Sequence, residues 1–276
     1  MISVGPFSIQ VVAVFAAVLL AWTVTRGLAR RLPDPGRAAG GMLLDAAFWG
    51  FVTARLGYIA QWWEEYASSP RSMLSIGDQG FSWWVGVLVA LGLIAWRTRS
   101  SPALRRPVLI GMAAGLLSWF AAAGVLERLQ RSAPPLPALA LATLDEQPVV
   151  LNAYLGQPVV LNLWASWCPP CRREMPVFAQ AQTQYPDIAF VMVNQGESAE
   201  QARAFLESQG LHLKHVLLDP GSRTLQAVAT RGLPTTLFFD EHGRLVDSHF
   251  GELTMARLKN TVSHRFAQSQ SAQTQE

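Results

Sequence analysis

The stretch NLWASWCPPCRREMP, Asn162 to Pro176, contains both cysteines of this 276-residue chain. The apolar run before the cysteines, VVLNLWAS, is typical of a buried strand, and the residues after them, REMPVFAQAQTQY, are typical of a helix. Cys168 is therefore expected at a strand-to-helix turn, with Cys171 one turn inside the helix. The fold class then depends on the secondary structure of the segments on either side of the cysteines.

Short strands alternate with amphipathic helices on both sides of the cysteine pair. The expected strands are 159–164, 188–194, 216–219, 235–240 and 245–250, and the expected helices are 168–184, 199–209, 222–230 and 254–266. This alternation predicts an α/β domain over residues 139–266. The polar tail 267–276 has no period and is expected to be disordered.

The first half of the chain is apolar enough to enter a membrane. Four apolar runs each approach the roughly 20 residues that a helix needs to cross hydrocarbon, at 7–25, 42–63, 81–96 and 108–126. No basic residue precedes the first run, which is longer than the core of a signal peptide, so it is expected to stay in the mature protein. Residues 1–131 therefore predict an α-helical membrane region of about four transmembrane helices, followed by a proline-rich linker at 132–138.

The distribution of arginine predicts the orientation of these helices. Segments 26–37 and 97–106 contain four arginines each, whereas segment 64–80 contains one arginine and three acidic residues. Because cytoplasmic loops retain basic residues, the first two segments are expected in the cytoplasm. Four spans that start outside also end outside. The α/β domain is thus predicted in the periplasm, on a multi-pass protein of the bacterial inner membrane.

The net charge of +3 gives no support for nucleic-acid binding. Residues 1–131 contain 12 basic and 6 acidic residues, and residues 132–276 contain 10 basic and 13 acidic residues. The pI of about 9.2 therefore reflects the membrane-proximal loops. A nucleic-acid-binding domain would need a basic face interleaved with aromatic residues on one folded domain.

The position of the cysteines predicts their chemistry. Unpaired N–H groups and the dipole at a helix N-terminus stabilise an anion, which favours an attacking thiolate at Cys168. Cys171 would then resolve the mixed disulfide. Pro169 and Pro170 have no N–H to offer the Cys168 sulfur, so only the Cys171 N–H remains. This predicts a disulfide toward the reducing end of the range for such motifs.

Other uses of the two thiols are less well supported. A structural bridge across three residues would close a very small loop and constrain little chain entropy. A zinc site needs four ligands, and no second cysteine pair exists. His212 and His215 lie in a segment that alternates like a strand edge, where solvated histidines are expected. We therefore expect no metal and no cofactor other than a redox-active Cys168–Cys171 disulfide.

The segment LNLWASWCPPCRREMP resembles the active site of the TlpA-like and ResA-like thioredoxin-fold proteins, which are membrane-tethered extracytoplasmic thiol-disulfide oxidoreductases. The resemblance extends over about 138–265 through ATLDEQPVVLNAYLGQPVVLNLW, VMVNQGES and RGLPTTLFFDEHGRLV. It implies a thioredoxin fold with a cis peptide bond before Pro234. It also implies that the exposed backbone of Leu233 pairs with an extended client segment.

Two positions refine this comparison, and a third residue stands out by its place beside Cys168. Asn162 stands where thioredoxin has a buried Asp, and Asn cannot act as a base. Glu174 matches a Glu of the cytochrome-maturation members, and a partly buried carboxyl there could accept the Cys171 proton. Glu174 could instead only favour the first helical turn by its charge. Trp167, beside Cys168, is expected to shield the sulfur and to offer an apolar contact to clients.

The membrane half resembles another family over about residues 40–125. DAAFWGFVTARLGYI and GFSWWVGVLVALG are similar to parts of prolipoprotein diacylglyceryl transferase. Trp84 and Val85 stand in place of the His-Gly pair in that family's G-x-S-x-H-G-G run, which argues against transferase chemistry. Arg55 is expected to face the bundle interior, either at a lipid headgroup or satisfied by backbone carbonyls or water. Gly111 and Gly115 would permit close helix contact.

Together these observations predict a membrane-anchored periplasmic thiol-disulfide oxidoreductase, with reduction of client disulfides favoured over oxidation or isomerisation. The membrane half has no cysteine to relay electrons by thiol exchange, so a separate membrane electron donor is expected. The partners are client proteins with disulfides or thiols. Two alternatives remain: a lipid-handling membrane protein of the diacylglyceryl transferase type with an appended redox domain, and a copper-delivery thiol protein.

Overall fold

The computed structural model of the chain describes residues 3–4, 7–30, 36–68, 70, 73, 78, 80–99, 101–131, 135–230 and 232–266. The chain divides into two compact units. The helical unit is formed by Ile2–Met73 and Gly80–Arg128, and the α/β unit is formed chiefly by Leu129–Glu276. Residues 132–134 of the predicted linker and the predicted tail 267–276 lie outside the described residues.

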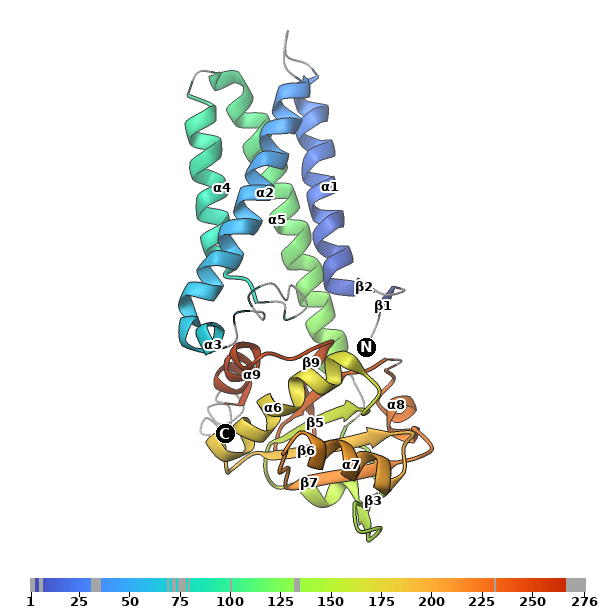
Figure 1. The fold of residues 1–276 in the computed structure, drawn as a ribbon. Helices are drawn as coiled ribbons and strands as arrows, with labels where there is room; N and C mark the ends of the chain where they lie inside the picture. The colour runs from blue at the N-terminus through green and yellow to red at the C-terminus, as the bar shows by residue number, and fades with distance from the viewer. Residues whose placement is uncertain are drawn as a thin grey trace. The chain divides into compact units, whose positions relative to one another are not determined.

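The helical unit contains four long helices that run side by side (Figure 1). They are α1 (Ile9–Ala29), α2 (Gly36–Gln61), α4 (Trp83–Arg97) and α5 (Pro102–Arg131); short α3 (Trp63–Ser68) follows α2, and the two-residue strands β1 (Ser3–Val4) and β2 (Phe7–Ser8) pair before α1. Two stretches of the described residues are long and apolar enough to cross a membrane, Val12–Ala29 and Pro102–Val125. The structure thus has two candidate spans, and the other two predicted spans stay predictions.

Close contact between α1 and α5 depends on glycine. A Cβ atom placed on Gly111 would lie 1.9 Å from the Thr25 hydroxyl and 2.6 Å from the Ala21 carbonyl oxygen. A Cβ atom on Gly115 would lie 2.9 Å from the Ala21 side chain and 3.0 Å from the Ala17 carbonyl oxygen. The predicted helix contact at Gly111 and Gly115 is therefore present, and its partner is α1.

Replacement of Gly111 by leucine is expected to destabilise the helical unit by about 1–3 kcal/mol, because a side chain there must push the two backbones apart. Gly124→Leu is the matched control on the same helix, since a Cβ atom at Gly124 meets nothing within 4 Å. The measurement is thermal unfolding of the full chain, followed by circular dichroism. Equal unfolding midpoints for the two variants would contradict the packing described above.

The α/β unit is built on a seven-stranded sheet with the order β4-β3-β7-β6-β5-β8-β9. Its elements are β3 (Ala140–Thr143), β4 (Pro148–Val150), η3 (Leu151–Tyr154), β5 (Val159–Trp164), α6 (Pro169–Gln184), β6 (Ala189–Gln195), α7 (Ala199–Ser208), β7 (His215–Asp219), α8 (Arg223–Ala227), β8 (Thr235–Phe239), β9 (Leu245–Phe250), α9 (Met255–Thr261) and the π-turn η4 (Val262–Phe266). The central strands β5, β6 and β7 are parallel, and the other pairs are antiparallel. The predicted α/β domain is confirmed.

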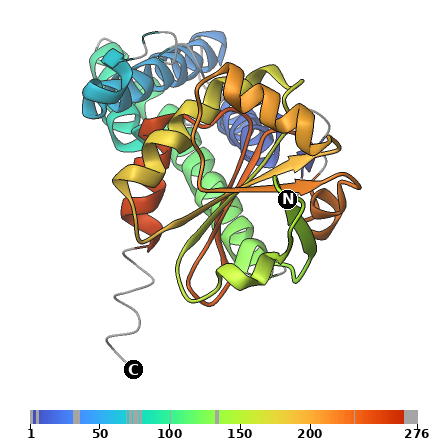
Figure 2. The ribbon, with the colours of Figure 1, turned by 60° about the horizontal axis from the view of Figure 1, so that its bottom comes forward.

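Both faces of this sheet are covered, which explains why its central strands are continuous apolar runs. On one face, Val160 and Trp164 of β5 join a buried cluster with side chains of α6, α7 and α9. On the other face, Leu161 and Leu163 of β5 join a second cluster with residues near η3 and α8. Figure 2 shows the helices of the first cluster beside the strands. The cysteine pair belongs to the first cluster.

The C-terminal ends of two helices of the α/β unit differ from the prediction by more than one residue. Helix α8 begins at Arg223, because the buried Asp219 carboxylate accepts hydrogen bonds from the N–H groups of Arg223 and Thr224. It ends at Ala227, three residues earlier than predicted, and Ala229 then has a positive φ of 53°. The predicted helix 254–266 is α-helical only to Thr261 and closes with the π-turn.

Candidate active site

The two cysteines lie where the central strand β5 passes into helix α6. Cys168 is the N-cap residue of α6 and has extended backbone angles, and Pro169 and Pro170 occupy the first helical positions, where a missing N–H costs nothing. The Cys171 N–H donates a hydrogen bond to the Cys168 sulfur at 3.3 Å. The sequence predicted this donor, because Pro169 and Pro170 have no N–H.

Cys168 and Cys171 form a disulfide. Cys171 is completely buried, and Cys168 retains 3% of its surface exposed. Of the two cysteines, Cys168 is thus the one that reaches the surface. Trp167, the residue before it, is 67% exposed and so projects from the surface beside this point of access.

Glu174 lies one helical turn after Cys171, and residues three apart share a helix face. Its side chain is completely buried, which exceeds the partial burial expected from sequence. One carboxyl oxygen accepts a hydrogen bond from Asn162 Nδ2 at 2.8 Å, and the other accepts from the Leu253 N–H at 2.8 Å. Burial raises the pKa of Glu174 to about 8, against the opposing effect of the two hydrogen bonds. The carboxyl is therefore largely protonated at neutral pH.

Asn162 connects Glu174 to the neighbouring strand. Its Nδ2 also donates to the Thr236 hydroxyl at 3.1 Å, and the two residues are register partners on β5 and β8. The Asn162 Oδ1 atom is buried and has no hydrogen-bond partner within the described residues. The side chain therefore acts as a donor toward Glu174.

The peptide bond between Leu233 and Pro234 is cis, as the family resemblance implied. Leu233 packs against the buried cluster that contains both cysteines. Phe250 of β9 lies beside this loop and is 41% exposed; a Cβ atom on Gly232 would come within 2.7 Å of its ring. The sequence did not indicate Phe250, because it comes next to Gly232 only through the pairing of Thr235 with Phe250.

The described residues hold no group of three or more His, Cys, Asp or Glu side chains that could bind a metal ion. His212 is exposed, whereas His215 is half-buried and contacts the Tyr154 ring with centroids 5.0 Å apart. Burial and the neighbouring Lys214 lower the pKa of His215. His215 is therefore packed against Tyr154, whereas His212 faces the surface.

Similarity to known proteins agrees with this geometry. The Redoxin family model matches residues 131–262. Thioredoxin-like protein YneN of Bacillus subtilis is 35% identical over 130 residues, which cover 46% of this chain and 75% of that protein. Thiol-disulfide oxidoreductase ResA of Bacillus subtilis is 31% identical over 129 residues, covering 46% of this chain and 72% of that protein.

The chain belongs to the ResA-like thiol-disulfide oxidoreductases. A further ResA, from Halalkalibacterium halodurans, is 33% identical over 116 residues, which cover 41% of this chain and 65% of that relative, just under two thirds of its length. All the cysteines of this ResA-like chain lie in the region matched by the Redoxin family.

The N-terminal part of this ResA-like chain is similar to a different family. The prolipoprotein diacylglyceryl transferase family matches residues 1–124. In this part, the buried Arg55 donates hydrogen bonds to the carbonyl oxygens of Gly80 at 2.9 Å and Met73 at 3.1 Å. Its guanidinium also lies 5.3 Å from the centre of the Tyr66 ring. Arg55 therefore faces the interior of the helical unit and donates to backbone carbonyls there, and a lipid headgroup site at Arg55 stays a prediction.

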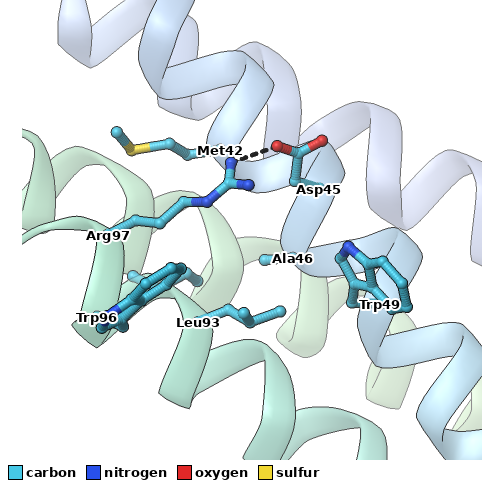
Figure 3. Close-up of a pocket in the computed structure, with 8 residues that line it drawn as sticks. Met42, Asp45, Ala46, Trp49, Leu93, Trp96 and Arg97 are labelled. Atoms are coloured by element: carbon cyan, nitrogen blue, oxygen red, sulfur yellow. Dashed lines mark hydrogen bonds and ion pairs between the residues drawn. The ribbon is translucent and has the colours of Figure 1, made fainter.

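A pocket of about 160 Å³ lies between α2 and α4 of the helical unit (Figure 3). Asp45 and Arg97 form an ion pair across it, and Trp49 and Trp96 stand on opposite sides (Figure 3). The remaining lining is apolar: Met42, Ala46, Leu93 and Ile94. Both partners of this ion pair are partly exposed, 41% for Arg97 and 53% for Asp45. No residue of this lining can perform thiol exchange.

Proposed function

We propose that this chain is a membrane-anchored extracytoplasmic reductase of client-protein disulfides. The observation that carries the proposal is the joint placement of a cysteine pair at the start of α6 and a buried, largely protonated carboxyl on the same helix. The nucleophile, the resolving thiol and a proton source thereby lie within two turns of one helix.

The proposed reaction has two exchange steps. The Cys168 thiolate attacks a client disulfide, a Cys168–client bond forms as the client bond breaks, and the departing client sulfur takes a proton from solvent. In the fraction of molecules in which Glu174 is ionised, Cys171 then loses its proton to that carboxylate and attacks the Cys168 sulfur, which releases the second client thiolate to be protonated. Two electrons pass to the client, and the Cys168–Cys171 disulfide remains.

Reduction of the Cys168–Cys171 disulfide regenerates the dithiol, and it uses the same residues in the opposite direction. A donor thiolate attacks Cys168, and Cys171 departs as a thiolate that takes the Glu174 proton. The second thiolate of the donor then attacks the donor sulfur of the mixed disulfide, which releases the Cys168 thiolate and leaves the donor oxidised. A carboxyl with a pKa of about 8 is suited to both directions, because it holds a proton in the disulfide form and can accept one near the same pH. The reducing equivalents must come from a separate dithiol donor, since the chain has no other cysteine.

The reducing direction is proposed from the hydrogen bonding of Cys168. Its sulfur receives one N–H, that of Cys171, and the two prolines have none to add. Weak stabilisation of the thiolate leaves the disulfide less oxidising. Clients are proposed to lie against Trp167, with their backbone along Leu233 and Pro234.

The proposed topology is four spans, with the α/β unit in the periplasm. Support comes from the apolar stretches Val12–Ala29 and Pro102–Val125 and from the arginine-rich segments 26–37 and 97–106. The domain limits proposed from sequence, 1–131 and 139–266, accompany this topology. Tagging of the C-terminus in cells would test it.

Replacement of Cys171 by alanine is expected to leave clients covalently bound to Cys168, because the mixed disulfide can no longer be resolved. The measurement is isolation of the full chain from cells under non-reducing conditions, followed by mass spectrometry of peptides linked to Cys168. The Cys168→Ser, Cys171→Ala double variant is the control and should retain none. Absence of cysteine-linked partners from the single variant would refute the function.

The direction of exchange requires a separate measurement. Redox titration of the full chain against dithiol buffers should give a potential near the thioredoxin end of the range, about −270 mV, rather than the roughly −120 mV of a strong oxidant. A value at the oxidising end would contradict reduction and leave exchange itself intact.

A further inference from the structure

Another buried acidic side chain, that of Glu197, lies in the loop between β6 and α7 and is 6% exposed. One of its oxygens accepts hydrogen bonds from the Ser166 N–H at 2.7 Å and from Asn194 Nδ2 at 2.6 Å. The other oxygen accepts from the Ser166 hydroxyl. Two of the three donors therefore come from one residue, two positions before Cys168.

Ser166 is the middle of the turn Ala165–Trp167 that joins β5 to the N-cap of α6. On either side of it, Ala165 is completely buried and Trp167 is 67% exposed. The Cys168 N–H donates to the Ala165 carbonyl at 3.2 Å, so the backbone position of Cys168 depends on this turn. Fixing Ser166 therefore fixes the direction in which Trp167 projects and the position from which the Cys168 sulfur reacts.

A purely local role for Glu197 does not account for these contacts. Helix α7 already has its cap, because Ser198 and Gln201 form a complete capping box. An ion pair does not explain the burial either, since no ion pair joins Glu197 to a basic side chain among the described residues. Burying a carboxylate without a cation costs free energy unless hydrogen bonds replace its lost hydration. Here two of the three hydrogen bonds to Glu197 come from Ser166.

We propose that Glu197 is a positioning residue for thiol-disulfide exchange: it holds the Ala165–Trp167 turn through Ser166, so that Cys168 and Trp167 meet a client in reactive geometry. This inference rests on the proposed function for its consequence in catalysis. Glu197 and Ser166 lie 31 residues apart in sequence, so no local pattern connects them.

The test uses the reduced full chain with Glu197→Gln, Ser166→Ala and the double variant. The matched control is Glu200→Gln, which makes the same chemical change at an exposed position three residues away. Two second-order rate constants are measured at pH 7, one for reduction of a protein disulfide such as that of insulin and one for alkylation of Cys168 by iodoacetamide. Circular dichroism sets a temperature at which every variant is folded.

Glu197→Gln is expected to lower both rate constants tenfold to a hundredfold, the range expected for misplacing a reacting group by about 1 Å. Ser166→Ala keeps the N–H and should lose less, and the double variant should be no slower than Glu197→Gln. Glu200→Gln should stay within twofold of the parent. A role limited to stability would lower the unfolding midpoint and leave both rate constants of the folded protein unchanged.

Rates within twofold of the parent for Glu197→Gln, or effects that multiply in the double variant, would overturn the inference. If Glu197→Gln does not fold, Ser166→Ala carries the test alone, and an unchanged alkylation rate would overturn it. A parent chain that reduces no protein disulfide would refute the proposed function instead. In that case the alkylation rates still decide whether Glu197 holds the turn.

Discussion

Replacement of Cys168 by serine is expected to lower the rate of client-disulfide reduction by more than about a thousandfold. The serine hydroxyl cannot form the mixed disulfide, and removal of a nucleophile from an enzyme costs rate factors of this order or larger. The fold should be retained, because serine is a preferred N-cap residue and can accept the Cys171 N–H in place of the sulfur. The measurement is the rate of insulin-disulfide reduction by the full chain with excess dithiothreitol as donor.

Cys171→Ser is the informative comparison for this result. It retains the attacking sulfur, so it should complete one exchange per molecule and then stop as a mixed disulfide. Turnover by Cys168→Ser within tenfold of the parent would mean that Cys171, which is completely buried, attacks clients directly. That outcome would reverse the assignment of nucleophile and resolving thiol.

Replacement of Glu174 by glutamine is expected to slow turnover on the order of a hundredfold at pH 7, at the lower end of what a positioned acid–base group supplies. Glutamine can still accept the Leu253 N–H through its carbonyl oxygen, but it cannot exchange a proton with Cys171. The measurement is the pH dependence of the same reduction assay. The parent profile should contain a titration near pH 8 that the variant lacks.

The same substitution should change how stability depends on pH. The pKa of Glu174 rises from 4.5 to about 8 on folding, so the folded chain holds a proton there that the unfolded chain has lost. Its contribution to stability is complete below pH 4.5 and is lost as the pH rises through 8. The free energy of unfolding of the parent should therefore fall relative to Glu174→Gln across this window.

His249 makes the free energy of unfolding change with pH in the direction opposite to the effect of Glu174. Burial, followed by the Arg257 guanidinium, lowers its pKa from 6.5 to about 4, so its contribution makes the free energy of unfolding rise between pH 4 and 6.5. His249 is unchanged in the variant, so subtracting the two stability curves removes its contribution. Glu207→Gln on the exposed face of α7 is the control for loss of one charge. A difference curve that is flat from pH 4.5 to 8 would show that Glu174 is ionised in the folded chain.

The sequence predicted strands β5 to β9 and helices α6 to α9 of the α/β unit because their patterns are local. The strands at 159–164 and 245–250 are present with the predicted limits, since continuous or alternating apolar residues directly reflect burial of two faces or one. The thiols could be placed for the same reason, because a strand, a Cys-x-x-Cys spacing and a helix follow one another without a gap. Two of the four apolar runs also meet the criteria for a membrane span.

The environment of the carboxylates could not be predicted in this way. Glu174 is completely buried and accepts a hydrogen bond from the Leu253 N–H, 79 residues away, whereas the sequence suggested only partial burial. Helix α6 begins at Pro169 and has no acidic residue in its first turn, so the alternative that Glu174 only favours the first turn by its charge is wrong. Glu197 was not singled out at all, although it occurs in the quoted segment VMVNQGES. Its partner Ser166 belongs to another loop, and the two meet only because parallel strands β5 and β6 end at the same edge of the sheet.

The unequal exposure of the two sulfurs has a kinetic consequence. In the disulfide form Cys168 is 3% exposed and Cys171 is completely buried, so in the proposed reaction the electron donor approaches the same residue that a client leaves. Donor and client would then compete for one point of access, and the proposed cycle alternates between two half-reactions without a ternary complex. Substituted-enzyme kinetics, in which an excess of released product delays the incoming donor, are therefore the kinetics that the proposed reaction predicts.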